Sequence, residues 1–298
     1  MSKRRSRAAE RKLHIFSGSV YPELAEEMAG HLDVELGDIT LEKFANGETY
    51  ARFMESVRGE DVFLVQSISG DVNDALMELL IMVDAAKRAS ARSVSAVVAH
   101  YGYARQDRKA APREPITAKL VADLMAASGV DNVITIDLHQ DAIQGFFDIP
   151  VDHLYASGVF IPYIQSLRLK DMVIGSPDVG GSKRANSYAK YFGCPLVLCN
   201  KTRARANVVD SMQIIGDVKG KDVIIVDDMV DTAGTITKAA DIMKEAGAKS
   251  VRASASHCVM SGPASERVQS SALEEIVFTD SIPYTDRCSK VKQLSVAD

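Results

Sequence analysis

The sequence predicts an α/β fold made of two similar domains in tandem. Residues 61–67 and 222–228 match position by position, and each run is followed by a polar turn, a helix and a second strand. A small basic turn precedes that second strand, which begins at Ser93 in one copy and at Ser250 in the other. The repeated unit indicates an internal duplication in which each copy builds a mainly parallel sheet flanked by helices. At 298 residues, the chain has the length of two ordinary domains.

Bulk composition is that of a globular protein, with 46% hydrophobic and 25% charged residues. The formal net charge of −5 gives no reason to expect a nucleic-acid partner. Because no apolar run reaches membrane-spanning length and no signal-peptide core is present, we expect no membrane partner and a cytoplasmic location. The four cysteines lack metal-ligand or redox spacing, which is typical of cytosolic thiols. Residues 1–12 are basic without an apolar face, so we expect a disordered tail rather than a basic contact.

The first domain is expected to span residues 13–155. It opens with a strand near residues 13–16 and a helix from Pro22, because proline suits the first turn of a helix. An aromatic followed by a turn signal, Phe44 to Glu48, is consistent with a hairpin. A further buried strand is expected at residues 133–137.

A cation-rich stretch, residues 101–109, follows the strand expected at residues 94–99. Its arginine and lysine side chains can bind phosphates, and Tyr103 and Arg105 can stack on a base or form hydrogen bonds to it. The stretch therefore suggests a nucleotide-like ligand for the first domain. A solvated basic loop is the alternative for its last two residues.

One histidine, His139, stands just past the strand at residues 133–137. A histidine in such a place is often structural. Beside a ligand pocket, however, and with Asp137 able to orient its ring, it is a candidate ligand for a metal or a phosphate.

The second domain is expected to span residues 156–298, with strands at residues 172–175 and 195–198. Asp178 lies in the turn after the first of these strands and is either a turn former or a metal ligand. The stretch 200–207 carries three cations and few core-forming residues. We expect a mobile loop that closes over an anionic substrate, and a plain solvated loop is the alternative.

The chain is organised around residues 222–235. A β-branched run ends in two adjacent acids, Asp227 and Asp228, and small polar residues then open a helix. In an open α/β sheet, ligands bind outside the carboxyl ends of the strands. The N–H groups and the positive dipole end at a helix start suit a phosphate, while the carboxylates can accept hydrogen bonds from vicinal hydroxyls or face a metal. The stretch therefore predicts a pocket for a phosphorylated sugar.

The alternative is an ordinary helix capped by Asp231 or Thr232. It leaves Asp227 and Asp228 unexplained, because adjacent like charges repel unless something pairs them. The first copy carries neutral residues where the second copy carries its acids, and these neutral residues are Gln66, Ser67 and Gly70. The sugar-phosphate chemistry is therefore expected in the second domain only.

The stretch 222–235 resembles the fingerprint of the phosphoribosyltransferase-type fold. From Leu13 to Asp298, the whole chain resembles class I ribose-phosphate diphosphokinase. Several independent motifs carry this resemblance in the same order along the chain: Phe44–Glu48, Asn73 with Leu76–Leu79, Tyr103–Asp107, Asp137–His139, Ile143–Phe147, Ser176–Asp178 and Asp227–Thr235.

The resemblance implies that the β,γ-diphosphoryl group of Mg-ATP is transferred to the 1-hydroxyl of ribose 5-phosphate, with release of AMP. It implies Mg²⁺ as cofactor, a homohexamer, and an allosteric site for phosphate or ADP. The first domain is then expected to bind ATP and the second to bind ribose 5-phosphate.

The resemblance also implies a role for particular residues. The expected catalytic cations are Lys201 and Arg203, and the expected Mg²⁺ ligands are His139 and Asp178. The residues expected to bind ATP are Phe44, Asn46, Gly47, Glu48, Arg105 and Gln106. The residues expected to bind ribose 5-phosphate are Arg203, Asp227, Asp228, Asp231, Thr232, Ala233, Gly234 and Thr235.

A few residues depart from the family pattern. Asn46 stands where many relatives carry aspartate, which removes a charge near the adenine. Thr202, Ala204 and Ala206 replace the arginine and prolines common in the catalytic loop, so the stiffness of that loop differs.

Two other functions share part of this pattern. A phosphoribosyltransferase that consumes phosphoribosyl diphosphate has the same sugar-phosphate pocket, but usually has one domain and does not need Arg105, Gln106 and His139. A non-catalytic partner subunit is expected to lack Lys201 and Arg203, and both are present. A P-loop kinase is excluded, because no glycine-rich run ends in Gly-Lys-Ser or Gly-Lys-Thr.

Overall fold

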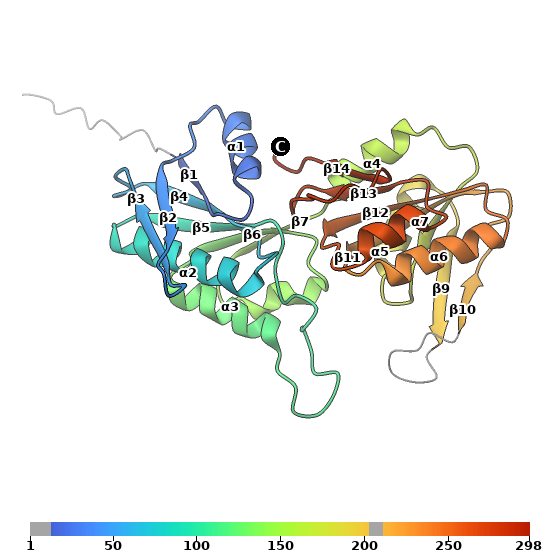
Figure 1. Ribbon diagram of the computed structural model, residues 1–298, viewed down its shortest axis with the longest axis horizontal. Helices are drawn as coiled ribbons and strands as arrows, with labels where there is room; N and C mark the ends of the chain where they lie inside the picture. Colours follow the sequence, from blue (N-terminus) through green and yellow to red (C-terminus); the bar gives the residue numbers. More distant parts are fainter. Residues whose placement is uncertain (1–12, 203–210) are drawn as a thin grey trace, which may run out of the picture. The chain divides into compact units, whose positions relative to one another are not determined.

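The computed structural model describes residues 13–202 and 211–298 (Figure 1). The chain divides into two compact units, one running to Leu154 and the other from Tyr155 to Val296. The expected basic tail at residues 1–12 lies outside the described residues, as does most of the expected mobile loop.

The N-terminal domain is built on a five-stranded sheet of order β1-β4-β5-β6-β7, in which every neighbouring pair is parallel. A separate antiparallel hairpin, β2-β3, packs on α2, and it confirms the turn expected at Phe44 to Glu48. The elements are β1 (Leu13–Ser17), α1 (Pro22–His31), β2 (Ile39–Lys43), β3 (Thr49–Phe53), β4 (Asp61–Val65), α2 (Val72–Arg88), β5 (Ser93–Val98), α3 (Thr117–Ser128), β6 (Asn132–Ile136), the 3-10 helix η1 (Asp141–Phe146) and β7 (Val151–Leu154).

The C-terminal domain is built on a seven-stranded sheet of order β10-β9-β8-β11-β12-β13-β14, parallel except for β10. The elements are α4 (Ser157–Ser166), β8 (Met172–Ser176), α5 (Ser182–Phe192), β9 (Leu196–Thr202), β10 (Ser211–Ile215), β11 (Asp222–Val230), α6 (Gly234–Glu245), β12 (Ser250–Cys258), α7 (Ala264–Ser270), β13 (Ile276–Thr279) and β14 (Val291–Leu294). The sequence prediction of two α/β domains with mainly parallel sheets is therefore confirmed.

The strand registers of the two sheets confirm the duplication residue by residue. Asp61 is the first residue of β4, and Asp222 is the first residue of the matching strand, β11. Each of them pairs with the first residue of both neighbouring strands. These partners are Leu13 and Ser93 for Asp61, and Met172 and Ser250 for Asp222. Counting on from them, Gln66 corresponds to Asp227 and Ser19 corresponds to Asp178.

The same duplication appears in a pair of contacts at the starts of the matching strands. Asp222 is 3% exposed and accepts hydrogen bonds from Ser250 Oγ (2.5 Å) and Lys249 Nζ (3.0 Å). Asp61 accepts the equivalent hydrogen bonds from the basic residue and the serine at the start of β5. Burial alone would raise the pKa of the Asp222 carboxyl, but these two donors lower its pKa below the ordinary value.

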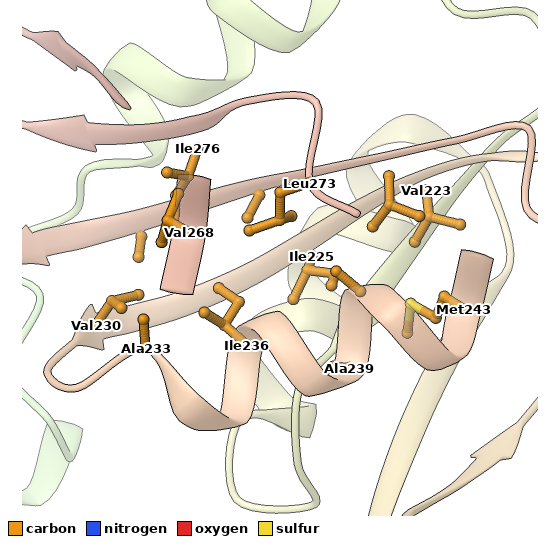
Figure 2. Packing of buried hydrophobic residues seen from close by; sticks show 14 of the residues in the cluster. Val223, Ile225, Val230, Ala233, Ile236, Ala239, Met243, Val268, Leu273 and Ile276 are labelled. Atoms are coloured by element: carbon orange, nitrogen blue, oxygen red, sulfur yellow. The ribbon is translucent and has the colours of Figure 1, made fainter. Parts of the chain in front are cut away.

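Helix α6 packs an apolar face on the second sheet (Figure 2). Ile236, Ala239 and Met243 are at most 2% exposed and contact the core side of β11, to which Val223 and Ile225 belong. These residues recur at helical spacing, which buries one face of the helix. The packing fixes where α6 begins, at the carboxyl end of β11.

Two strands extend further than the sequence predicted. Strand β11 runs to Val230, so Asp227 and Asp228 lie within it and not after it. The reason is unequal pairing: β8 accompanies β11 only as far as Ile225, whereas β12 continues to Val230. Strand β9 likewise reaches Thr202, because β10 pairs with it through that residue, so the expected loop does not begin at residue 200.

Candidate active site

Three carboxyl groups lie at the carboxyl edge of the second sheet, where β8 ends and β11 continues. Asp178 follows β8, and Asp227 and Asp228 lie on β11. An ideal Cβ placed on Gly181 would lie 3.8 Å from Asp178 Oδ1 and 3.9 Å from Asp227 Oδ1, so both carboxylates approach the same point. A Cβ here would also lie only 2.9 Å from Ser176 Oγ, so glycine leaves that hydroxyl in place.

Hydrogen bonds hold these carboxylates in place. Asp178 Oδ1 accepts from the amide of Gly181 (2.9 Å), where α5 begins, and the Asp178 carbonyl accepts from Ser176 Oγ (2.7 Å). Asp227 Oδ1 accepts from the amide of Asp228 (2.9 Å). The carboxylates of Asp178 and Asp227 are therefore fixed before any ligand binds.

The electrostatics of this group favour a cation. Burial and the neighbouring carboxylate of Asp228 raise the pKa of Asp227 well above its ordinary range, and Asp178 adds to the rise. Within residues 13–202 and 211–298, no three metal-ligating side chains form a ready cluster. An open set of carboxylate oxygens fits Mg²⁺, which keeps several waters and is held by one or two carboxylates together with substrate phosphates.

The loop at residues 231–235 connects β11 to α6 without a side-chain cap. Helix α6 begins at Gly234, and its N-cap is Ala233, which has a left-handed backbone (φ 60°) and makes no side-chain capping bond. The alternative of a helix capped by Asp231 or Thr232 is therefore wrong. A left-handed residue before a helix start turns successive N–H groups to one side, which makes a concave site for an anion.

The counterpart of this site in the N-terminal domain is closed. Gln66 stands in the place of Asp227, and its amide donates to Glu78 Oε1 (2.7 Å), which also accepts from the amide of Ser19 (2.7 Å). Gln66 and Glu78 are 1% and 5% exposed. A cavity of about 280 Å³ remains nearby, but three acids, Asp71, Asp74 and Glu78, line it against one cation, Lys43, and this acidic lining disfavours a phosphate. Glu78 belongs to the motif Leu76–Leu79 that carries the family resemblance, but its hydrogen bond to Gln66 was not predicted, since in sequence it is one polar residue on a helix.

The expected ATP-binding residues of the hairpin lie in the β2–β3 turn. Phe44 is 53% exposed, with its ring centroid 5.8 Å from that of Tyr50. Asn46 Oδ1 accepts from the amide of Glu48 (3.2 Å), and Gly47 has a positive φ of 91°. The turn thus presents an aromatic face to solvent on a fixed backbone.

The other expected ATP-binding residues, Arg105 and Gln106, follow β5 and are exposed. Gln106 Oε1 accepts from Thr117 Oγ1 (2.6 Å) at the start of α3. Tyr103, just before them, donates a short hydrogen bond to Asn73.

The β2–β3 hairpin and the loop after β5 both contact the first turn of α2. Tyr103 is bonded to Asn73 there, and Lys43, which precedes Phe44, is ion-paired with Asp74. The hairpin and the loop after β5 are therefore anchored at the same end of one helix.

The remaining expected site residues are His139, Lys201 and Arg203. His139 is half-buried after β6, and its loop is held by a hydrogen bond from the amide of Leu138 to His153 Nε2 (3.0 Å). It belongs to the N-terminal domain and Asp178 to the C-terminal domain. Lys201 lies on β9 opposite Met212, and Arg203 lies outside the described residues.

Comparison with known proteins agrees with this organisation. Residues 13–129 match the family model for the N-terminal domain of ribose phosphate pyrophosphokinase, and residues 159–285 match the phosphoribosyl transferase domain. A Porphyromonas gingivalis protein named ribose-phosphate pyrophosphokinase is 58% identical over 290 residues, covering 97% of this chain and 92% of that protein. The chain belongs to the ribose-phosphate pyrophosphokinase family.

Other members of the ribose-phosphate pyrophosphokinase family also match this chain over nearly its full length. A Helicobacter pylori protein of that name is 52% identical over 297 residues, covering 100% of this chain and 93% of that protein. The crystal structure of phosphoribosylpyrophosphate synthetase from Mycobacterium smegmatis superposes with a TM-score of 0.92 at 44% identity, covering 96% of this chain and 95% of that one. Among the helices in the described part of this family member, none is long and apolar enough to cross a membrane.

Proposed function

We propose that this protein transfers the diphosphoryl group of ATP to the 1-hydroxyl of ribose 5-phosphate, giving 5-phosphoribosyl 1-diphosphate and AMP for nucleotide biosynthesis. The structural observation that carries the proposal is the group of Asp178, Asp227 and Asp228 beside an uncapped, left-handed turn at a helix start. Such an arrangement offers separate places for sugar hydroxyls, for a divalent cation and for a phosphate.

Ribose 5-phosphate binds to the C-terminal domain, residues 156–298, in this proposal. The loop at residues 231–235 receives the 5-phosphate through its N–H groups and the hydroxyls of Thr232 and Thr235. Asp227 and Asp228 accept hydrogen bonds from the ribose hydroxyls, which orients the 1-hydroxyl for attack. Charge-assisted hydrogen bonds of this kind are short and directional, so they position the nucleophile.

ATP binds to the N-terminal domain, residues 13–155. Phe44 packs on the adenine, because its ring is exposed on a rigid turn, and Asn46, Gly47 and Glu48 supply polar groups beside it. Arg105 and Gln106 bind the remainder of the nucleotide. Arginine is suited to phosphate because its planar donors match the oxygens in pairs.

Mg²⁺ is the cofactor that the acidic group suits, with Asp178 and His139 as its proposed protein ligands. When bound, it neutralises phosphate charge and orients the diphosphoryl group for in-line displacement. The imidazole is the less typical of the two ligands, because Mg²⁺ prefers oxygen.

Lys201 and Arg203 act on the charge that develops during transfer. The 1-hydroxyl of the sugar attacks the β-phosphorus, the bond from that phosphorus to the α,β-bridging oxygen breaks, and AMP leaves with that oxygen. Phosphoryl transfer needs alignment and charge neutralisation more than covalent help, and these two cations supply the charge neutralisation.

The family also implies a homohexamer and a cytoplasmic location for this protein. Light scattering on the purified protein measures the first directly, and a mass of six chains is the expected result.

Release of AMP tests the reaction against its nearest rival. The protein is mixed with Mg-ATP and ribose 5-phosphate in the absence of any nucleobase, and the nucleotides are separated by chromatography. We expect AMP to form only when ribose 5-phosphate is present. A phosphoribosyltransferase that consumes phosphoribosyl diphosphate forms no AMP under these conditions, so absence of AMP would overturn the proposal.

A further inference from the structure

Three hydrogen bonds that fix the segment before α6 are accepted by the backbone carbonyls of residues 230–232. The carbonyl of Val230 accepts from the amide of Met260 (2.9 Å), and the carbonyl of Asp231 accepts from the amide of Ser261 (3.0 Å). The third carbonyl, that of Thr232, accepts from Arg267 Nη1 (2.8 Å). Two donors are therefore backbone groups, and the third is a side chain from α7.

These carbonyl contacts determine where the amides of the loop point. In a trans peptide, the carbonyl of one residue and the N–H of the next point in opposite directions. The carbonyls of residues 230–232 face the segment 260–267, so the amides of residues 231–233 face away from it. Among the described residues, none accepts a hydrogen bond from the amide of Thr232 or Ala233. Arg267 thus orients the last peptide before α6.

Arg267 is held in position by the packing of α7. Its neighbour Val268 is fully buried and faces Ile276 in the core, and Ala264 at the start of the helix is also fully buried (Figure 2). Arg267 itself is exposed, and Nη1 would lie 3.5 Å from a Cβ placed on Gly234, the first residue of α6. The guanidinium therefore lies over the first turn of α6.

In the absence of a ligand, the dipole of α6 opposes a cation in this place, and the hydrogen bond to the Thr232 carbonyl holds it there. The amino end of a helix carries positive partial charge, so it repels a guanidinium and attracts an anion. A phosphate bound by the amides of residues 231–233 lies across their peptides from the guanidinium, and the dianion then attracts the cation through the loop. The position of Arg267 is thus one that a bound phosphate stabilises.

We propose that Arg267 is a positioning residue for the 5-phosphate of the sugar substrate. It turns the Thr232–Ala233 peptide so that its N–H faces the phosphate, and its positive charge raises the affinity of the loop for that group. The inference rests on the proposed function, since it takes ribose 5-phosphate as the ligand of the loop.

Kinetics of Arg267→Met and Arg267→Lys test the assignment. We expect Arg267→Met to raise KM for ribose 5-phosphate by about tenfold, the usual effect of losing a charged hydrogen-bond partner. KM for Mg-ATP and kcat are expected to stay within about twofold, and Arg267→Lys, which keeps the charge, to recover about half of the loss on a logarithmic scale. Lys238→Met is the matched control, because it removes one exposed cation from α6 itself.

The results separate this role from general stability and from failure of the proposed function. Wild-type AMP formation is measured first, and it decides the reaction independently of any variant. Melting temperatures within about two degrees of wild type show that the fold is intact. The assignment of Arg267 is overturned if Arg267→Met behaves like Lys238→Met, if it raises both KM values equally, or if Arg267→Lys is as impaired as Arg267→Met.

Discussion

The most direct prediction concerns Ala233 in the loop at residues 231–235, the phosphate loop, which is proposed to bind the 5-phosphate. Its φ of 60° is left-handed, and its side chain is only 4% exposed, against the core that Figure 2 shows. A left-handed conformation costs an L-residue about 1–2 kcal/mol, which glycine does not incur. Ala233→Gly regains this amount, but loses about 0.8 kcal/mol of buried methyl and about 0.5–1 kcal/mol of chain entropy. The net change in the free energy of unfolding is therefore expected to lie within about 1 kcal/mol of zero.

Ala233→Val makes the same position unfavourable in two ways. A β-branched side chain resists the left-handed conformation, and two added methyl groups overpack a buried position, which typically costs about 1–3 kcal/mol. We expect Ala233→Val to lose about 2–4 kcal/mol in all and to bind ribose 5-phosphate poorly, because relief of the strain turns the loop amides away.

Urea unfolding of wild type, Ala233→Gly and Ala233→Val measures these differences, and AMP formation at varied ribose 5-phosphate measures the functional effect. The valine variant is informative relative to the glycine variant, because both change the same residue. If Ala233→Val unfolds at the same urea concentration as wild type, residue 233 is not both left-handed and buried, and the description of the phosphate loop is wrong.

Three further substitutions test the proposed catalytic lysine, the proposed ATP site and the contact at the start of β11. Lys201→Ala is expected to lower kcat by about 10²- to 10³-fold with little change in KM for ribose 5-phosphate, and wild-type turnover would exclude its assigned role. Phe44→Ala is expected to raise KM for ATP by about tenfold, as loss of a stacked base does, whereas Leu32→Ala, which removes an equally exposed side chain, leaves it unchanged. Asp222→Asn is expected to lower the free energy of unfolding by about 1–3 kcal/mol at pH 7 without affecting catalysis. Because the folded pKa of Asp222 is lowered, its contribution is complete above the ordinary value of 3.8 and is lost as the pH falls through the lower folded value, so wild type and variant converge in acid. A stability difference that persists undiminished at the lowest pH would contradict this cause.

The duplicated architecture could be predicted because it follows from local sequence patterns. The runs that begin at Asp61 and Asp222 have the same apolar spacing, and the registers of their strands proved identical. Strand lengths could not be predicted, because they depend on neighbours: β11 outlasts β8 only because β12 continues beside it. That unequal pairing, and not the end of the strand, leaves Asp227 beside Asp178.

The acidic group was predictable residue by residue, but its geometry was not. Asp227 and Asp228 stood out as adjacent like charges, whereas nothing in the sequence placed Gly181 between two carboxylates. Arg267 was missed for the same reason. It lies 35 positions beyond Thr232, and an exposed arginine on a short helix gives no signal until its hydrogen bond is seen. Long-range side-chain contacts of this kind are set by packing and are not visible in local pattern.

A single ³¹P NMR experiment tests the central claim, which is that a sugar phosphate seated in the C-terminal domain receives both outer phosphates of ATP together. The protein, Mg-ATP and ribose 5-phosphate are combined in one tube, and the phosphorus species are followed with time. We expect equal amounts of AMP and of a phosphorylated sugar whose new diphosphate gives two phosphorus signals coupled to each other, beside the signal of its 5-phosphate. Formation of ADP with a single new phosphate ester on the sugar, or an unchanged spectrum, would contradict it.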